Sequence, residues 1–171
     1  MMSDGKTLNI LTEDKIQRIL KRMSIQILEN NLGVSKVVLV GITGQGYQMA
    51  VLLQNILQTT HGASITCDLA ELIIDKKNPV EGDISLSIAI DLLNHQTVIL
   101  VDDVINTGRT QAYGIKFLLT AAIKKLETAI LVDRSHKLFP VSTSYCGLAL
   151  STTLEEHVEV SLETGRGAFL Y

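Results

Sequence analysis

The chain has 171 residues, a length that fits one domain over 1–171 with a sizeable core. Apolar residues make up 46%, charged residues 19%, and the net charge is −3; this excludes a strongly basic nucleic-acid binder and favours a homodimer or higher homo-oligomer. The amino terminus lacks the pattern of a signal peptide, and no apolar run reaches membrane-spanning length. We therefore expect a cytoplasmic protein that makes no membrane contact.

The first part of the chain predicts an irregular lead-in over 1–9 and an amphipathic helix over 12–31. A threonine at the start of the helix can cap it, and an asparagine and a glycine can end it. Lys15, Arg18 and Arg22 form a basic row on one face of this helix. We interpret the row as a solvated face, with an RNA or phosphate contact surface as the alternative.

A glycine-rich turn separates a strand predicted over 36–40 from a helix predicted over 47–60. Such a turn can hold phosphate with backbone N–H groups, although a tight turn without a ligand has the same composition. The candidate phosphate-binding residues here are Thr43, Gly44, Gln45 and Gly46. Farther along, apolar strands are predicted over 65–74 and 84–90, and the polar loop 75–83 joins them as a possible hairpin.

The central pattern of the chain is a strand, two acids, a short polar loop and a helix. Residues 98–101 are β-branched or apolar throughout, which is typical of a strand buried on both faces. Asp102 and Asp103 follow, and a helical pattern begins at about residue 110. Helix-start N–H groups suit a phosphate, and the two carboxylates suit ribose hydroxyls or a hydrated Mg²⁺. The loop residues are Asn106, Thr107, Gly108, Arg109 and Thr110, which we call the phosphate loop.

The rest of the chain predicts three further strand segments. A buried strand over 128–132 runs into Asp133 and Arg134, another covers 145–150, and a hairpin is expected around 164–167. Strands that alternate with helices predict a mainly parallel α/β sheet. Ligands of such sheets bind outside the carboxyl ends of the strands, where all these motifs fall. The two cysteines are expected to be buried free thiols.

The string VILVDDVINTGRT over 98–110 closely resembles the 5-phosphoribosyl-1-diphosphate (PRPP) motif of type I phosphoribosyltransferases. From residue 10 to 171, the order and spacing of the motifs are similar to those of the bacterial pyrimidine-operon attenuation regulators, which are also uracil phosphoribosyltransferases. The resemblance implies the type I fold, with a mainly parallel sheet flanked by helices, an antiparallel flap and a C-terminal hairpin. It implies transfer of 5-phosphoribosyl from PRPP to a pyrimidine, with uracil as the expected base, giving UMP and diphosphate with Mg²⁺ as cofactor.

The resemblance also assigns roles by position. Asp102 and Asp103 would be catalytic, would bind the ribose hydroxyls and would hold Mg²⁺, partly through water or substrate. Residues 43–46 would bind the diphosphate and residues 106–110 the 5′-phosphate of PRPP. The residues that would border the base are Val132, Asp133 and Arg134.

This chain departs from the family pattern in ways that matter for chemistry. Regulators typically have an aromatic residue in place of Asn106, and enzymes acting on 6-oxopurines have an aspartate there, so the neutral amide disfavours hypoxanthine and guanine. Thr43 and Gln45 stand where regulators carry cations, and the flap offers Lys76 and Lys77 but no arginine. Each missing cation removes about 2 to 4 kcal/mol of stabilisation from the leaving diphosphate.

Two alternatives to an efficient enzyme therefore stay open. One is a nucleotide-sensing, RNA-binding regulator of pyrimidine genes with weak or no catalysis, and the other is a structural oligomer component with a relic site.

Overall fold

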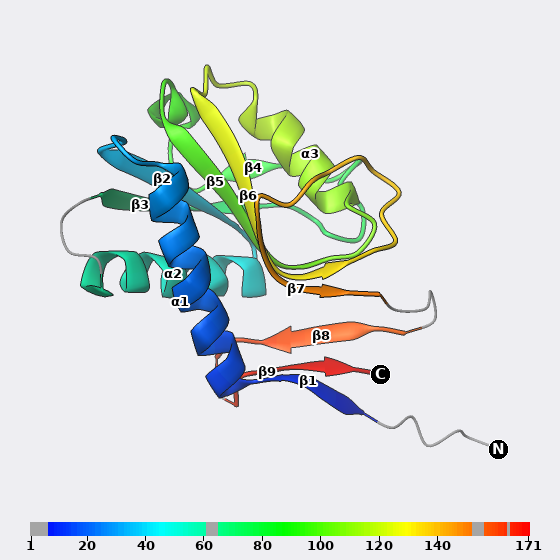
Figure 1. Ribbon diagram of the computed structural model, residues 1–171. Coiled ribbons are helices and arrows are strands. Elements are labelled where there is room, and N and C mark those ends of the chain that lie inside the picture. The colour runs from blue at the N-terminus through cyan, green and yellow to red at the C-terminus, as the bar shows by residue number, and fades with distance from the viewer. Residues whose placement is uncertain (1–6, 61–64, 152–155, 164) are drawn as a thin grey trace.

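The computed structural model describes residues 7–60, 65–151, 156–163 and 165–171. A six-stranded sheet in the order β4-β3-β2-β5-β6-β7 forms the centre of the molecule (Figure 1). All of its neighbouring strands pair in parallel except β4, which is antiparallel to β3, so the mainly parallel α/β sheet is confirmed. The strands are β2 (Lys36–Ile42), β3 (Thr66–Ile73), β4 (Ser85–Leu86), β5 (Thr97–Ile105), β6 (Lys125–Arg134) and β7 (Tyr145–Leu150).

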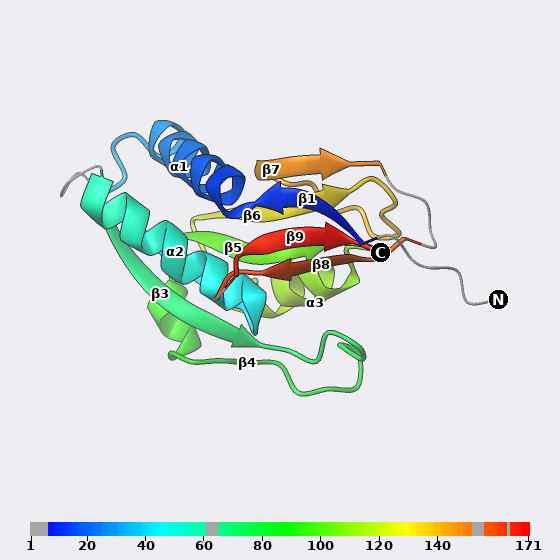
Figure 2. The same ribbon diagram turned by 90° about the horizontal axis from the view of Figure 1, so that it is seen from below.

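A second, antiparallel sheet joins the two ends of the chain in the order β1-β9-β8 (Figure 2). Its strands are β1 (Leu8–Thr12), β8 (Val158–Ser161) and β9 (Gly167–Leu170), so the C-terminal hairpin is confirmed. The lead-in predicted over 1–9 is wrong at its end, because Leu8 and Asn9 pair with Leu170 and Phe169. This short, largely exposed strand depends on a partner more than 150 residues away, and it has no alternating pattern of its own.

Helices cover both faces of the central sheet, and the alternation of side chains along β2 shows how. Val37 and Leu39 pack into the cluster that contains residues of α1 (Glu13–Asn30) and α2 (Gln45–Thr60). Val38 and Val40 face the opposite cluster, which α3 (Arg109–Leu118) covers. Both faces are thus apolar, as expected for a parallel sheet.

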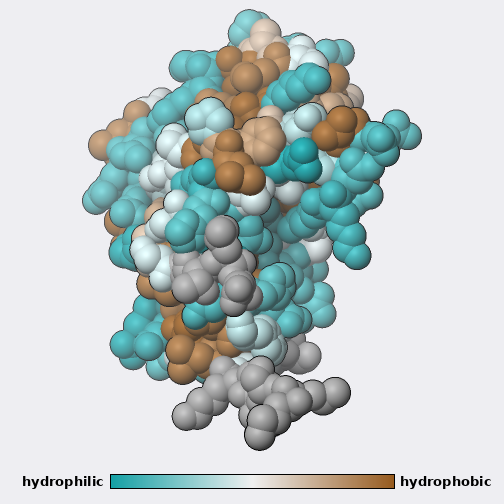
Figure 3. All heavy atoms as spheres, turned by 90° about the vertical axis from the view of Figure 1, so that its right-hand side faces the viewer, coloured by the Kyte–Doolittle hydropathy of each residue, from teal (hydrophilic) through white to brown (hydrophobic). Residues whose placement is uncertain are grey.

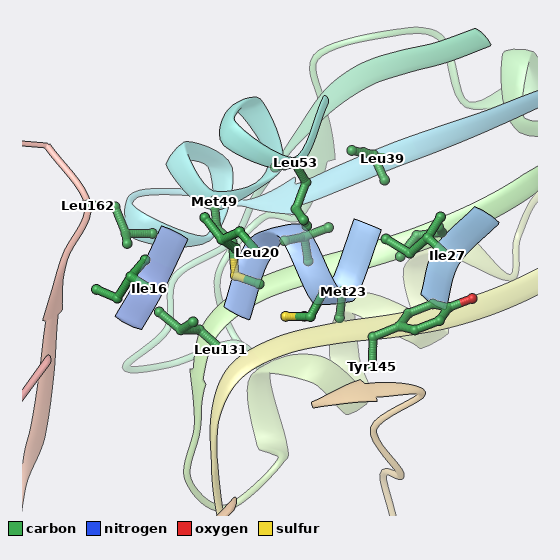
Figure 4. Packing of buried hydrophobic residues seen from close by; sticks show 14 of the residues in the cluster. Ile16, Leu20, Met23, Ile27, Leu39, Met49, Leu53, Leu131, Tyr145 and Leu162 are labelled. Atoms are coloured by element: carbon green, nitrogen blue, oxygen red, sulfur yellow. The ribbon is translucent and has the colours of Figure 1, made fainter. Parts of the chain in front are cut away.

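The cluster under α1 forms the larger part of the core (Figure 4). Ile16, Leu20, Met23 and Ile27 lie on one stripe of the helix, and each is at most 2% exposed. Full burial of each such side chain stabilises the fold by about 1.5–3 kcal/mol. The predicted cap of α1 is confirmed, because the hydroxyl of Thr12 accepts a hydrogen bond from the first turn at 3.4 Å.

The flap is shorter than the sequence predicts. Only Ser85 and Leu86 pair with β3, and a 3₁₀ helix over Ile90–Leu93 replaces the end of the expected strand. The alternating apolar side chains of this segment pack against the α3-side core, so their period reflects packing more than strand pairing. They are Ile84, Leu86, Ile88 and Ile90.

Two further expectations concern the whole chain. Cys67 and Cys146 are both free; Cys67 is buried and Cys146 half-buried. Across the described residues, none of the helices combines the length and apolar character that a membrane crossing requires.

The α1 stripe yields a matched test of stability. Ile27→Ala empties a fully buried position, so we expect the free energy of unfolding to fall by about 2–5 kcal/mol. Ile25→Ala changes a side chain on the same helix that is 46% exposed, and we expect a change within about 0.5 kcal/mol. Urea unfolding followed by circular dichroism measures both values; equal losses would contradict this description of the core.

Candidate functional site

A cavity of about 630 Å³ opens where β5 ends. One wall is the end of β5 with the phosphate loop and the start of α3. A second is Lys76 and Lys77 after β3, and a third is residues 157–160, of which the last three lie on β8. The molecular face at the right of Figure 1, toward which β7 points, is largely hydrophilic, with hydrophobic side chains gathered mainly in its upper part (Figure 3). The predicted position of the site at the carboxyl end of the central strand therefore coincides with a real cavity.

Asp102 is the most deeply buried charged side chain of this site, at 1% exposed. Its Oδ1 accepts hydrogen bonds from Lys76 Nζ at 2.9 Å and from the Asp103 backbone N–H at 3.0 Å. Its Oδ2 accepts from Gln111 Nε2 at 2.7 Å, and Gln111 is itself buried. Three donors thus fix the orientation of the carboxylate.

Asp103 has a different environment. Its side chain is 13% exposed and lines the cavity, and its Oδ1 lies 3.4 Å from Lys76 Nζ. Of the two carboxylates, Asp103 is the better placed to accept hydrogen bonds from a ligand, whereas Asp102 holds the local structure together.

Burial and charge shift the pKa values of this cluster in identifiable ways. Burial raises the pKa of Asp102 well above its usual value, the neighbouring Asp103 raises it further, and Lys76 opposes both. Burial by itself lowers the pKa of Lys76, but the two carboxylates outweigh it and the net shift is upward. Lys76 is therefore a firmly charged counter-ion for the acidic pair.

The glycine turn approaches this cluster closely. A Cβ on Gly46 would lie 2.7 Å from Asp102 Oδ1 and 3.0 Å from the Val101 carbonyl oxygen, so a side chain there would displace the carboxylate. Gly44 has a φ of +84°, which the turn requires.

Gln45 lies in the first turn of α2 and lines the cavity, so the helix begins two residues before the sequence predicts. Its Oε1 accepts a hydrogen bond from the Leu162 N–H at 2.7 Å, which ties the turn to the end of β8. Thr43 instead donates its hydroxyl proton to Glu71 Oε1 at 2.8 Å on β3.

All five residues of the phosphate loop line the cavity. Gly108 has a φ of +81° and caps α3, which begins at Arg109. The Thr107 hydroxyl accepts from the Arg109 N–H at 3.3 Å, while the Thr107 carbonyl accepts from Leu138 and Phe139 N–H groups. The arginine side chain lies over the Phe139 ring at 5.8 Å. The loop thus presents a helix start, with its unpaired N–H groups and partial positive charge, to the cavity.

The expected base-bordering residues are arranged differently. Val132 is fully buried in the sheet core, and Asp133 Oδ2 accepts from Lys137 Nζ at 2.9 Å and from Thr143 Oγ1 at 2.7 Å. Within the described part of the chain, neither residue lines the cavity, nor does Arg134. Arg134 is 8% exposed and donates to Asn106 Oδ1 at 2.8 Å and to the Glu156 carbonyl at 2.7 Å.

Three contributions to the site were not predicted from the sequence. The contact of Lys76 with the acidic pair joins residues 26 apart, and the sequence suggested no more than a charge in the flap. Gln111 stands out in hindsight as a polar side chain in the first turn of a helix whose inner face is otherwise apolar. Nothing in the sequence indicated that residues 157–160 line the site, because their alternation of apolar and polar side chains is that of any half-buried strand.

The acidic pair fits a magnesium ion that is shared with a substrate. No group of three or more acidic, histidine or cysteine side chains that could hold a metal by themselves occurs among the described residues. Mg²⁺ is commonly held by one or two carboxylates together with substrate phosphates and water. Asp103 lines the cavity and would supply such a ligand, whereas both oxygens of Asp102 already accept hydrogen bonds, so Asp102 would contribute mainly its charge. Such an ion, when bound, would neutralise charge on a leaving diphosphate.

Residues 6–163 match the family model described as phosphoribosyl transferase domain, and the chain belongs to this family. Proteins called bifunctional protein PyrR are among its relatives. The one from Alkaliphilus metalliredigens is 31% identical over 92% of this chain and 90% of its own length. That of Bacillus subtilis is 32% identical, with 90% of this chain and 89% of the relative covered.

Solved structures support the same fold. A hypoxanthine-guanine phosphoribosyltransferase from Bacillus anthracis superimposes with a TM-score of 0.77 at 16% identity, covering 96% of both chains. A hypoxanthine phosphoribosyltransferase from Staphylococcus aureus gives 0.72 at 19% identity, covering 86% of this chain and 80% of that one. The type I phosphoribosyltransferase fold is thereby confirmed.

Removing the Lys76 cation should make stability fall more steeply as pH rises, because the pKa of Asp102 is raised even with Lys76 in place. In Lys76→Met the folded state keeps the Asp102 proton to still higher pH, whereas the unfolded chain releases it near the ordinary pKa of 3.8. The unfolded state then binds fewer protons, so the free energy of unfolding falls as pH rises above about 4. Because Lys76 is 38% exposed, we expect a loss of about 1–3 kcal/mol at pH 8 and little at pH 4.

Urea unfolding at pH 4, 6 and 8 measures this difference. Lys77→Met is the matched control, since it removes a cavity-lining cation beside the one that holds Asp102. A pH-independent loss in Lys76→Met, or the same pH trend in both variants, would contradict the role given to Lys76.

Proposed function

We propose that this protein transfers the 5-phosphoribosyl group of PRPP to a pyrimidine base, with uracil as the base, giving UMP and diphosphate. The observation that carries the proposal is that one cavity combines the acidic pair, the phosphate loop with the start of α3, and Gln45 at the start of α2. A ribosyl donor needs a partner for each of its parts, and these elements offer carboxylates for the ribose hydroxyls and backbone N–H groups for its phosphates.

In the proposed reaction the bond between the anomeric carbon and the diphosphate oxygen breaks, and its electron pair leaves with the diphosphate. The ring nitrogen of the base forms the new bond to that carbon and releases its proton to solvent water. Asp103 binds the ribose hydroxyls, and Asp102 keeps it in place through the Asp103 backbone N–H. Residues 106–110 hold the 5′-phosphate, whose binding energy keeps the sugar in position as the charge develops.

Several finer points belong to the same proposal. Mg²⁺ is the cofactor, residues 43–46 face the diphosphate, and residues 132–134 support the base from behind the cavity wall. The protein acts in the cytoplasm as a homodimer or higher homo-oligomer, and its apolar composition of 46% supports burial between copies.

Turnover is tested directly with PRPP, Mg²⁺ and a panel of bases, by measuring diphosphate release. We expect UMP formation with uracil. Asp103→Asn should lower kcat/KM about 10- to 100-fold, because charge-assisted hydrogen bonds to the sugar are lost. Asp68→Asn is the control. It breaks the ion pair between Asp68, near the start of β3, and Lys36 of β2, away from the cavity, and it should leave kcat/KM unchanged.

No turnover with any base would remove the enzymatic proposal. A thermal shift with PRPP or UMP then separates the remaining alternatives, since a ligand at 100 times its Kd adds roughly 2.7 kcal/mol to stability. A shift without turnover supports a nucleotide sensor, and no shift at all supports a relic site in a structural protein.

The second candidate function is a nucleotide-dependent, RNA-binding regulator of pyrimidine genes. Its support is the match to relatives called bifunctional over about nine-tenths of the chain. The basic row on α1 supports it less, because Arg18 pairs with Asp14 and Arg22 donates to two carbonyl groups of β7 at 3.1 and 2.8 Å. Arg22 therefore fastens α1 to the sheet.

Filter binding to pyrimidine leader RNA across a salt series tests this function. If the protein contacts RNA, the logarithm of the binding constant should fall linearly with the logarithm of the salt concentration, with a slope that reflects the number of phosphate contacts. The affinity for RNA should also change when UMP is added. Lys15→Ala should reduce that slope by about one if the row is the RNA surface. Binding that UMP does not alter would count against the regulator.

A further inference from the structure

The contact between Arg134 and Asn106 fixes which end of the asparagine amide faces the cavity. Arg134 Nη1 donates to Asn106 Oδ1 at 2.8 Å, while Nη2 donates to the Glu156 carbonyl. A guanidinium group carries donors and no acceptor, so the atom it meets must be the amide oxygen. Because the amide is planar, its N–H₂ group points away from Arg134. Asn106 lines the cavity and Arg134 does not, so the N–H₂ group is what a ligand meets.

The position of Asn106 suits the base of a nucleotide. It lies three residues after Asp103, which is placed for the ribose, and three residues before Arg109, where the helix that is placed for the 5′-phosphate begins. Asp133 already accepts two hydrogen bonds, from Lys137 and Thr143, and lies outside the cavity lining. Of the side chains expected near the base, Asn106 is the one that the cavity exposes.

We propose that Asn106 determines base specificity by donating its amide N–H to the 4-carbonyl of an oxo-pyrimidine, and that Arg134 is its positioning residue. The inference rests on the proposed function and deepens it: Asn106 serves the base and leaves the 5′-phosphate to residues 107–110. Uracil offers an oxygen acceptor at that position, whereas cytosine offers an amino group. Two donors facing each other leave both unpaired, so the site rejects the amino-pyrimidine.

Asn106→Asp isolates the exposed end of the amide. The aspartate still accepts from Arg134, but it presents an oxygen in place of N–H₂. We expect wild type to bind UMP at least 10-fold more tightly than CMP, measured by isothermal titration calorimetry. In the variant, UMP should lose 10- to 100-fold in affinity and CMP much less, because its amino group can donate to the carboxylate.

PRPP serves as the ligand control, since it has no base. The negative charge of the new aspartate repels phosphate groups. PRPP carries more phosphate charge than UMP, so this repulsion alone should lower the affinity for PRPP at least as much as the affinity for UMP. A UMP loss that exceeds the PRPP loss therefore supports a base contact.

Arg134 is tested through the same UMP-to-CMP ratio. Arg134→Met frees the amide to flip, so the ratio should fall toward one with little change for PRPP. Arg134→Lys keeps a donor-only head and should restore the preference, which a purely structural role would not do.

Equal losses for UMP, CMP and PRPP in Asn106→Asp, or a ratio that Arg134→Met leaves intact, would overturn this inference while the proposed function stands. If wild type binds neither UMP nor PRPP, the proposed function fails and the inference fails with it.

Discussion

The burial of the Asp102 carboxylate at the end of β5 is the constraint on which the rest of the site depends. An ionised carboxylate inside a protein is tolerated when it is paired and hydrogen-bonded. Here the partners come from three separate segments: Lys76 from the flap, Gln111 from α3 and the Asp103 N–H from the same strand. Gly46 adds a steric condition, because α2 can start beside this carboxylate only without a Cβ. The Asp102 carboxylate thus fixes how the flap, α2 and α3 are placed relative to one another around one cavity.

The central strands could be predicted because their sequence carries its own evidence. Residues such as 98–101 are apolar at every position, which only a strand covered on both faces tolerates, and the structure confirms burial on both sides. The predicted end of the lead-in and the predicted length of the second flap strand were wrong for the opposite reason. Leu8 becomes part of a strand through pairing with Leu170, and the alternation over 84–90 records contacts with the core. Neither cause is local, so local periodicity could not reveal it.

Residues of the site could likewise be predicted where the evidence is local in sequence, and could not where it depends on distant contacts. The phosphate loop was predictable residue by residue, because glycine at a helix start and acids at a strand end have chemical reasons to occur together. The pairing of Asn106 with Arg134 was not, since it joins residues 28 apart at the ends of two neighbouring strands. The resemblance placed Arg134 beside the base and Asn106 on the 5′-phosphate, and it could not show that one supports the other. Burial of Val132 follows from its place in β6, where residues 127–132 are buried on both faces of the sheet.

Under the proposed function, two neutral amides would supply part of the ligand binding in a cavity that lacks cations carried by similar regulators. Gln45 and Asn106 both line the cavity, and each commits its oxygen to a partner that can only donate: the Leu162 N–H and the Arg134 guanidinium. Both amides therefore offer N–H₂ groups to a ligand. A neutral hydrogen bond contributes about 0.5–1.5 kcal/mol, against about 1.5–3 for a charged one. Fixed neutral donors can orient a nucleotide well, but they stabilise charge building on a diphosphate less than cations do. In the proposed reaction, such donors would favour recognition of the ligand over speed of its reaction. The charge on the diphosphate would be left to Lys77 and Mg²⁺, because Lys76 is engaged by Asp102 and Asp103.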